Sequence, residues 1–340
     1  MTTTRTVPDV LCRAREVVEP AARAAIGRLS PEIRPLVEYH LGYRDERGRA
    51  CDGSAGGKGV RPALALLSAE SAGAPAATGV PGAVAVELVH NFSLLHDDVI
   101  DCDTERRHRP TVWSLHGIGR AIIAGDALLA LSQRLLLETP GGRGAAAALT
   151  LSEATGAMID GQALDMAFES CTAVDLESCL VMEQAKTGAL LGCASSIGAV
   201  LAGAPQPVRA ALEDFGVQLG LAFQAVDDLL GIWGDPRSTG KPVYSDLRQH
   251  KKTLPVVVAL AAGDGAASEL GELLAREHLD EAGVTRAAGL VETCGGREIT
   301  AGEARRCLAA ALAALERAPL AHRARAELAE VADFVVAREH

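Results

Sequence analysis

The spacing of apolar and polar positions predicts helices along most of the chain. Apolar residues recur at helical intervals in long stretches separated by short polar or glycine-rich segments, and no run alternates as a strand would. The expected helices cover 8–27, 31–41, 61–73, 80–103, 119–137, 146–168, 173–203, 208–233 and 252–262, with three more before the C-terminus. The best strand candidate, VVVAL at 256–260, follows a typical helix start, Lys-Lys-Thr-Leu-Pro. We therefore expect an all-α fold.

Three loops interrupt this pattern, at 44–59, 140–144 and 234–244. None of them divides the chain by composition, so we expect a single domain over residues 1–340. The C-terminal part alternates Ala and Leu with Arg and Glu, which indicates helices at the surface. Peripheral helices are accordingly expected at 1–30 and 270–340.

Composition excludes several classes of protein. Aromatic residues make up only 3% of the chain, which argues against a β-sandwich or barrel and for helices that pack through small residues. The 33 Lys and Arg residues against 44 Asp and Glu give a net charge of −11, so no basic field is available to hold nucleic acid. A small polyanionic substrate stays possible, because bound metals or a few local cations override net charge.

Nothing in the chain indicates export or a membrane anchor. The first ten residues lack the apolar core of a signal peptide. The segment Gly188 to Val208 carries no charge, and we interpret it as a central buried helix and not as a transmembrane segment. The eight cysteines are scattered without a C-x-x-C pair, which predicts reduced thiols, no structural zinc and a cytoplasmic location.

Acidic residues end two apolar helices. Asp97 and Asp101 lie one turn apart on the same helix face, with Asp98 beside them. Ionised carboxylates at the end of a buried helix repel one another unless a cation lies between them, and oxygen ligands suit Mg²⁺. The pair Asp227 and Asp228 ends a second apolar stretch in a similar way. Two such pairs facing each other across a helical bundle would hold a cluster of magnesium ions.

Cations accompany these acids. Lys58 and Arg61 stand in the glycine-rich segment GGKGVRP, and Arg106, Arg107 and Arg109 follow closely after Asp101. Backbone amides next to glycine, together with Lys and Arg, form an anion cradle. Carboxylates that bind metal, next to cations that bind the remaining oxygens, are the combination that a diphosphate requires.

Eight segments follow one another in a distinctive order along the chain: GGKGVRP, HNFSLLHDDVIDCDTERRHRPTVW, GDALL, GQALDMAF, KTGALLG, FQAVDDLLGIWGD, GKPVYSDL and KKTLP. This is the order found in trans-isoprenyl diphosphate synthases, and the chain resembles this family most closely in its geranylgeranyl members. The resemblance runs from about residue 56 to 256. It implies a prenyltransferase (terpenoid-synthase) helical bundle around a deep cavity, a homodimer, and Mg²⁺-dependent joining of isopentenyl diphosphate (IPP) to an allylic diphosphate.

The resemblance also implies roles for individual residues. Asp97, Asp101 and Asp227 match the ligands of about three Mg²⁺ ions, supported by Asp98 and Asp228. The IPP pocket would consist of Lys58, Arg61, His90 and Arg107. The allylic diphosphate and the nascent cation would contact Arg106, Lys186, Thr187, Gln224, Lys241 and Lys251. One departure stands out: the fifth position of the second acidic motif is Gly231, which predicts weaker support for the third ion.

The growing prenyl tail is expected to run from Asp97 towards the N-terminus of its helix. Phe92 lies about 7.5 Å along the axis from Asp97, at 1.5 Å per residue, where its ring would close the cavity. Ser93 beside it leaves width, and Val89 lies one turn further on. In the family this pattern resembles geranylgeranyl (C20) synthases, with farnesyl (C15) next, so we expect a C20 product.

Two other functions compete with this hypothesis. A class I terpene cyclase shares the first acidic motif, but would show an Asn-Asp-type second motif and would need no IPP pocket. A noncatalytic partner subunit of a prenyl synthase would be expected to lack the first aspartates, which are intact here.

Overall fold

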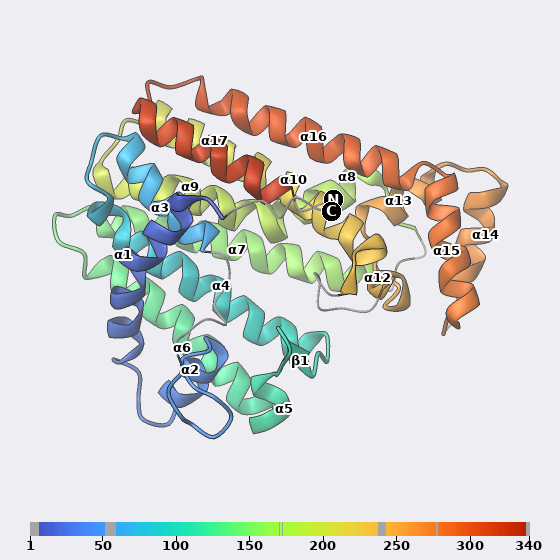
Figure 1. The fold of residues 1–340 in the computed structure, drawn as a ribbon, viewed down its shortest axis with the longest axis horizontal. Helices are drawn as coiled ribbons and strands as arrows, with labels where there is room; N and C mark the ends of the chain where they lie inside the picture. The colour runs from blue at the N-terminus through green and yellow to red at the C-terminus, as the bar shows by residue number, and fades with distance from the viewer. Residues whose placement is uncertain are drawn as a thin grey trace.

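The structure is a computed structural model that describes residues 7–51, 59–169, 171, 173–236, 243–276 and 278–337. It is an all-α bundle, as the pattern predicts (Figure 1). The helices are α1 (Asp9–Ile26), α2 (Arg34–His40), α3 (Val60–Ser71), α4 (Val80–Ile100), α5 (Val112–His116), α6 (Ile118–Leu137), α7 (Gly144–Glu169), α8 (Leu176–Glu183), α9 (Ala189–Ala202), α10 (Gln206–Trp233), α12 (Ser245–Arg248), α13 (Leu254–Ala261), α14 (Gly265–Leu274), α15 (Glu281–Thr293), α16 (Gly296–Leu315) and α17 (His322–Val336). A short 3₁₀ turn, η1 (Ala76–Gly79), precedes α4.

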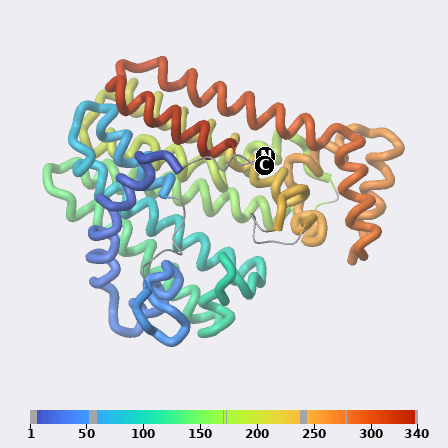
Figure 2. The backbone as a smooth tube through the Cα atoms, in the orientation of Figure 1, coloured from blue at the N-terminus to red at the C-terminus, as the bar shows by residue number. Residues whose placement is uncertain are grey.

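The long helices α4, α9 and α10 form the centre of the bundle. Helix α3 packs on α9, α6 packs on α4, and α16 runs along α10. The backbone trace shows the N-terminal helices on one side and the C-terminal pair α16 and α17 lying across the bundle (Figure 2). Although α16 and α17 lie at the edge as expected, each also contributes buried residues to the main core.

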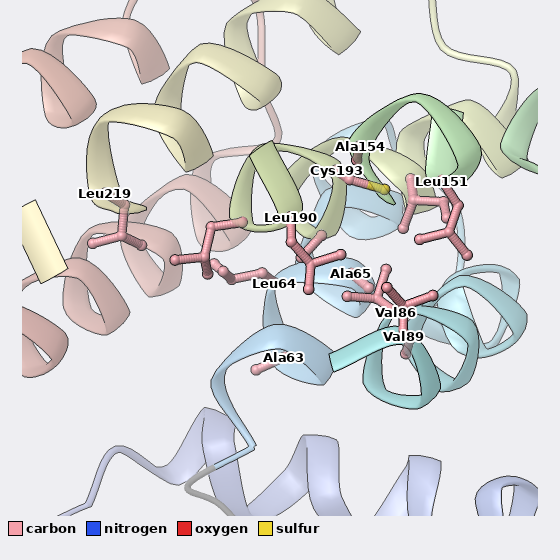
Figure 3. Packing of buried hydrophobic residues seen from close by; sticks show 14 of the residues in the cluster. Ala63, Leu64, Ala65, Val86, Val89, Leu151, Ala154, Leu190, Cys193 and Leu219 are labelled. Carbon is pink, nitrogen blue, oxygen red and sulfur yellow. The ribbon is translucent and has the colours of Figure 1, made fainter. Parts of the chain in front are cut away.

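Small residues allow these helices to approach one another closely. A Cβ atom on Gly198 of α9 would lie well under 3.0 Å from the carbonyl oxygen of Ala65 in α3. Gly216 of α10 has the same relation to the carbonyl oxygen of Leu191. Figure 3 shows the resulting contacts, in which Ala65 and Cys193 pack among leucine and valine side chains. Close packing of the helices through small residues thus fills a core that contains few aromatic side chains.

The uncharged stretch that begins at Gly188 lies inside the protein. Two helical stretches, Leu176–Ala202 and Gln206–Trp233, are long and apolar enough to span a membrane by length and composition alone. In the more apolar window of each, 78% and 56% of the residues are buried by other parts of the protein. These stretches therefore act as core helices in this fold.

A second, smaller apolar cluster lies beside the main core. It joins the end of α10 to α12, α13, α14 and α15 through residues such as Ile232, Leu247, Val256 and Leu270. Helix α10 also supplies the main core, and so do Leu254 and Val257 of α13. Because the same helices bury residues in both clusters, we propose that the chain folds as a single domain.

Three local features differ from the sequence-based expectation. Four helices, not three, follow α13, because only Cys294 and Gly295 separate α15 from α16. Two short strands, β1 (Glu105–Arg106) and β2 (Arg109–Pro110), form an antiparallel hairpin where no strand was expected. The expected helix 173–203 consists of α8 and α9 joined by a π-helical turn, η2 (Gln184–Gly188).

Candidate active site

The first acidic motif lies at the C-terminal end of α4, where burial makes negative charge costly. Asp98 is 1% exposed, and its Oδ1 accepts a hydrogen bond of 2.6 Å from Nε of Arg106. Asp97 is partly buried; burial, reinforced by the charge of Asp101 and offset by Lys186, raises its pKa to about 6. The motif thus contains one carboxylate that is neutralised by arginine and one that is poorly stabilised as an anion.

The hairpin after α4 carries the arginines of the site. Arg107 and His108 form its two-residue turn with positive φ angles of 53° and 59°, which is the type I′ geometry of a tight hairpin. Arg106 and Arg109 pair across the two strands, so that Arg106 reaches Asp98. A small pocket lies beside this hairpin, lined by Tyr39, His40, Asp98, Arg106, Arg107, Arg109, Pro110, Thr111 and Val112.

Two histidines next to these arginines are held neutral. Burial and then the charges of Arg61 and Arg107 lower the pKa of His90 well below its ordinary value. Burial and the charges of Arg106 and Arg107 lower the pKa of His40 to about 3. The His40 ring also lies 3.1 Å from the side-chain oxygen of the buried Asn91. This end of the site is therefore strongly cationic, as an anion pocket requires.

A chain of hydrogen bonds connects the second acidic motif to the centre of the site. The hydroxyl of Thr187 donates to Oε1 of Gln224, and Nε2 of Gln224 donates to Oδ1 of Asp228, each over 2.7 Å. The other oxygen of Asp228 accepts the backbone N–H of Leu254 at 2.9 Å. Asp227, next in sequence, is exposed. Asp228 is thus a buried anchor between α10 and α13.

Asp228 forms a buried carboxyl pair with Glu183. Burial raises the pKa of Asp228 to about 7, even though the hydrogen bonds from Gln224 and Leu254 favour its ionised form. Burial, and then the charge of Asp228, raises the pKa of Glu183 well above its ordinary value. Glu183 is 2% exposed and immediately precedes the π-helical turn. Burial beside Asp228 therefore favours the uncharged form of the Glu183 carboxyl.

Two lysines link the elements of the site. The amine of Lys186, in the π-helical turn, lies 2.5 Å from Oδ2 of Asp165 in α7. The amine of Lys251 lies 3.5 Å from Oδ2 of Asp101, which connects the segment before α13 to the first acidic motif. Although burial alone would lower the pKa of Lys251, the surrounding carboxylates raise it overall.

A cavity of about 340 Å³ extends from these groups between α4, α7 and α9. It contains the aromatic pair Phe92 and His96, whose ring centroids are 4.8 Å apart at an interplanar angle of 66°. Val89 is fully buried in the core and is not among the cavity residues, so chain-length control cannot be assigned to its side chain. The sequence-predicted residues that do line the cavity are Arg61, His90, Phe92, Ser93, Asp97, Lys186 and Thr187.

The donor set fits magnesium ions that are shared with a phosphate ligand. Asp97, Asp101 and Asp227 offer only oxygen atoms, and the buried Oδ2 of Asp98 has no hydrogen-bond partner. Within the described part of the chain, no three His, Cys, Asp or Glu side chains are gathered closely enough to enclose a metal ion by themselves. Mg²⁺ commonly takes one or two carboxylates and completes its shell with water and substrate phosphate oxygens.

The structure adds residues to the predicted set, and two of the predicted residues cannot be located in it. Lys58 and Lys241 lie outside the described residues. Asp165 was not assigned a role, although it lies in GQALDMAF and holds Lys186. His40 gave no sequence signal, because α2 lies outside the motif-bearing segment. The clues to Asp165 were its place in GQALDMAF and its acidic side chain within an apolar helix.

The chain is similar to known proteins over almost its whole length. A family model described as polyprenyl synthetase matches residues 51–291. A (2E,6E)-farnesyl diphosphate synthase of Mycobacterium tuberculosis is 49% identical, covering 99% of this chain and 94% of that protein. A geranylgeranyl diphosphate synthase of the same organism is 43% identical, covering 90% and 88%. The crystal structure of a polyprenyl synthetase from Streptomyces coelicolor has a TM-score of 0.93 at 52% identity, covering 97% and 100%.

The raised pKa of Asp97 predicts a pH-dependent effect of the Asp97→Asn substitution on metal-free protein. Between its ordinary value of 3.8 and about 6, the folded state binds more protons at this site than the unfolded state, so this carboxyl makes the protein less stable as pH rises. Asp97→Asn removes that loss. The variant should therefore have a higher unfolding free energy than the native chain. This gain should be larger at about pH 8 than at about pH 4, by on the order of 1–3 kcal/mol.

Urea unfolding in the presence of a chelator measures this difference. The exposed Asp160 of α7 provides the control, since Asp160→Asn should shift the unfolding free energy similarly at both pH values. A difference for Asp97→Asn that is independent of pH would contradict the assignment.

Proposed function

This chain belongs to the polyprenyl synthetase family and is a trans-prenyltransferase that makes prenyl diphosphates, and we propose that it does so by Mg²⁺-dependent, head-to-tail condensation of IPP with an allylic diphosphate. The observation that carries the proposal is the linkage of both acidic motifs to one cavity. Asp97 of the first motif lines the cavity, and Thr187 at the cavity wall is bonded through Gln224 to Asp228 of the second.

We assign the allylic diphosphate to the region between these motifs. Asp97, Asp101 and Asp227 would hold the Mg²⁺ ions, and the cations Arg106, Lys186 and Lys251 would bind the remaining phosphate oxygens. Asp98 orients Arg106, and Asp165 orients Lys186, in each case through an ion pair. Lys241 completes this set by its place in the sequence.

We assign IPP to the neighbouring cationic end of the cavity. Arg61 and His90 line the cavity, and Arg107 acts on the same histidine from the hairpin. A neutral His90 donates or accepts a hydrogen bond without adding charge. Lys58 joins this pocket by sequence alone.

The reaction needs stabilisation of separated charge. The carbon–oxygen bond of the allylic diphosphate breaks, its electron pair leaves with pyrophosphate, and the IPP double bond attacks the resulting cation before a proton is lost. Bound Mg²⁺ supplies Lewis-acid stabilisation of the leaving pyrophosphate. Because the Thr187 hydrogen points to Gln224, the hydroxyl lone pairs stay available to the cation at the cavity wall.

The two competing functions receive less support. Cyclisation needs no second diphosphate pocket, whereas Arg61 and His90 line the cavity next to the arginines of the hairpin. A noncatalytic subunit has no need for the bonded chain that ends at Asp228.

We propose geranylgeranyl (C20) diphosphate as the main product, with farnesyl (C15) diphosphate next. Phe92 lines the cavity five residues before Asp97, and its ring packs against His96. A Cβ atom on Gly125 would collide with His96, so the aromatic pair is held against α6. The name of the 49% identical relative supports the C15 alternative, and that of the 43% identical relative supports C20.

We further propose that the enzyme is a cytoplasmic homodimer that associates through α6 and α7. These neighbouring helices carry many of the exposed large apolar side chains, and such patches mark interfaces. Ile159 and Met166 of α7 also line the cavity, so a second copy seated there would help to close it. The exposed residues are Ile118, Ile122, Ile123, Leu137, Leu149, Ile159, Leu164 and Met166.

The proposed reaction predicts a linear prenyl diphosphate from purified protein, IPP, an allylic diphosphate and Mg²⁺. Dimethylallyl, geranyl and farnesyl diphosphates are supplied separately, and the products are identified by mass spectrometry. Asp227→Asn should lower turnover by about 10- to 100-fold, because it removes a ligand of a metal ion. A cyclic hydrocarbon would favour the cyclase, and absence of turnover in the native chain would favour the noncatalytic subunit.

Replacement of Phe92 should lengthen the product. Phe92→Ala removes a ring that lines the cavity and so makes more room for the prenyl tail, and chains longer than those of the native enzyme should accumulate. Val89→Ala is the matched control, because Val89 lies on the same helix but outside the cavity. An unchanged product distribution for Phe92→Ala would remove this residue from chain-length control.

Charge on α6 should break the dimer. Ile123→Glu places a carboxylate on a side chain that is 53% exposed in the isolated chain, and it should shift the mass measured by sedimentation from dimer to monomer. Ile299→Glu on α16, at a side chain that is 52% exposed, should leave the mass unchanged. A native chain that sediments as a monomer would contradict the proposal.

A further inference from the structure

The glycine at the fifth position of the second acidic motif adjoins a carboxylate from another segment. Gly231 lies near the end of α10, where a Cβ atom would approach Oδ2 of Asp246 to well under 3.0 Å. The same hypothetical Cβ atom would also collide with the carboxyl carbon and Oδ1 of Asp246. Asp246 therefore occupies the space that any side chain at position 231 would need.

Several contacts hold Asp246 in this place. The backbone N–H of Tyr244 donates to the carbonyl oxygen of Ile232 at 3.1 Å. The hydroxyl of Ser245 lies 3.2 Å from both the carbonyl oxygen of Gly231 and Oδ1 of Asp246. Asp246 itself is only 8% exposed. Helix α12 is thus docked on the end of α10 with its acidic side chain directed at Gly231.

Asp246 is also connected to the first acidic motif. The backbone N–H of Lys251 donates to the carbonyl oxygen of Asp246 at 2.9 Å, and the amine of Lys251 lies 3.5 Å from Oδ2 of Asp101. A buried carboxylate has a stronger influence on nearby charges than an exposed one, because water screens it less.

We propose that Asp246 supplies the carboxylate that the second acidic motif lacks at Gly231, and that it supports the metal ion and diphosphate held by Asp227. This inference rests on the metal-dependent function proposed above. It replaces the expectation of weaker metal support: the glycine is a requirement of the arrangement, because it leaves room for the substitute carboxylate.

The geometry allows an aspartate at position 231 to replace the carboxylate of Asp246. An aspartate at position 231 would carry its carboxyl group one bond, about 1.5 Å, beyond its Cβ atom. That Cβ atom falls beside the Asp246 carboxylate, so the transplanted group would occupy nearly the same region. The transfer requires that the side chain at position 246 be shortened at the same time.

The experiment compares four variants with the native chain: Asp246→Asn, Asp246→Ala, Gly231→Asp, and the double variant Gly231→Asp/Asp246→Ala. Binding of Mn²⁺ in the presence of inorganic pyrophosphate is measured by electron paramagnetic resonance, with turnover recorded in parallel. We expect each single variant to bind Mn²⁺ about 10- to 100-fold more weakly, as found for groups that support metal ligands. The double variant should recover most of the affinity.

Controls separate this role from a purely structural one. Gly289→Ala in α15 adds a Cβ atom where nothing lies within 4 Å, and it should bind Mn²⁺ like the native chain. Urea unfolding of every variant identifies loss of folding. Native affinity in Asp246→Asn, or a folded double variant no better than the singles, would overturn the inference. A native chain that binds no Mn²⁺ with pyrophosphate would instead overturn the proposed metal-dependent function.

Discussion

The structure depends on keeping carboxylates charged at the ends of buried helices. Burial opposes their ionisation, as the raised pKa values of Asp97 and Asp228 show. Three carboxylates meet this cost with a cation from another element: Arg106 for Asp98, Lys186 for Asp165 and Lys251 for Asp101. Asp228 instead accepts hydrogen bonds from Gln224 and Leu254. The cations that would bind phosphate therefore also keep the helix ends together, so site and fold share one set of interactions.

The π-helical turn between α8 and α9 also makes interactions that serve both the fold and the site. The turn places Lys186 and Thr187 next to each other, where one pairs with α7 and the other with α10. π-helical turns are rare and frequently occur at functional sites. From Thr187 the hydrogen bonds continue through Gln224 and Asp228 to the start of α13. A shift of this turn would therefore disturb the second acidic motif.

Helices and acidic residues were predictable from the sequence, because helical periodicity and paired aspartates are local signals. The burial of the uncharged stretch in α9 followed from its composition in the same way. The hairpin was not predictable, because Arg107 and His108 adopt positive φ angles that residues other than glycine rarely take. Asp165 and His40 escaped notice for another reason: their partners are distant in sequence and become visible only in the folded chain. Val89 follows the helical pattern but faces the core, which axial distance alone does not reveal.

Two glycines shape the site because each leaves room for a side chain from another segment. Gly125 leaves room for the ring of His96, which packs on Phe92 at the cavity wall, and Gly231 leaves room for the carboxylate of Asp246. In both cases the functional group comes from a different segment than the glycine. In the motifs GDALL and DDLLG, the glycine therefore contributes by leaving room for a side chain from another segment, beside the contribution of the charged residues. Because a Cβ atom at either position would displace one of these groups, the proposed chain-length control and the proposed metal support both depend on the absence of a side chain at these glycines.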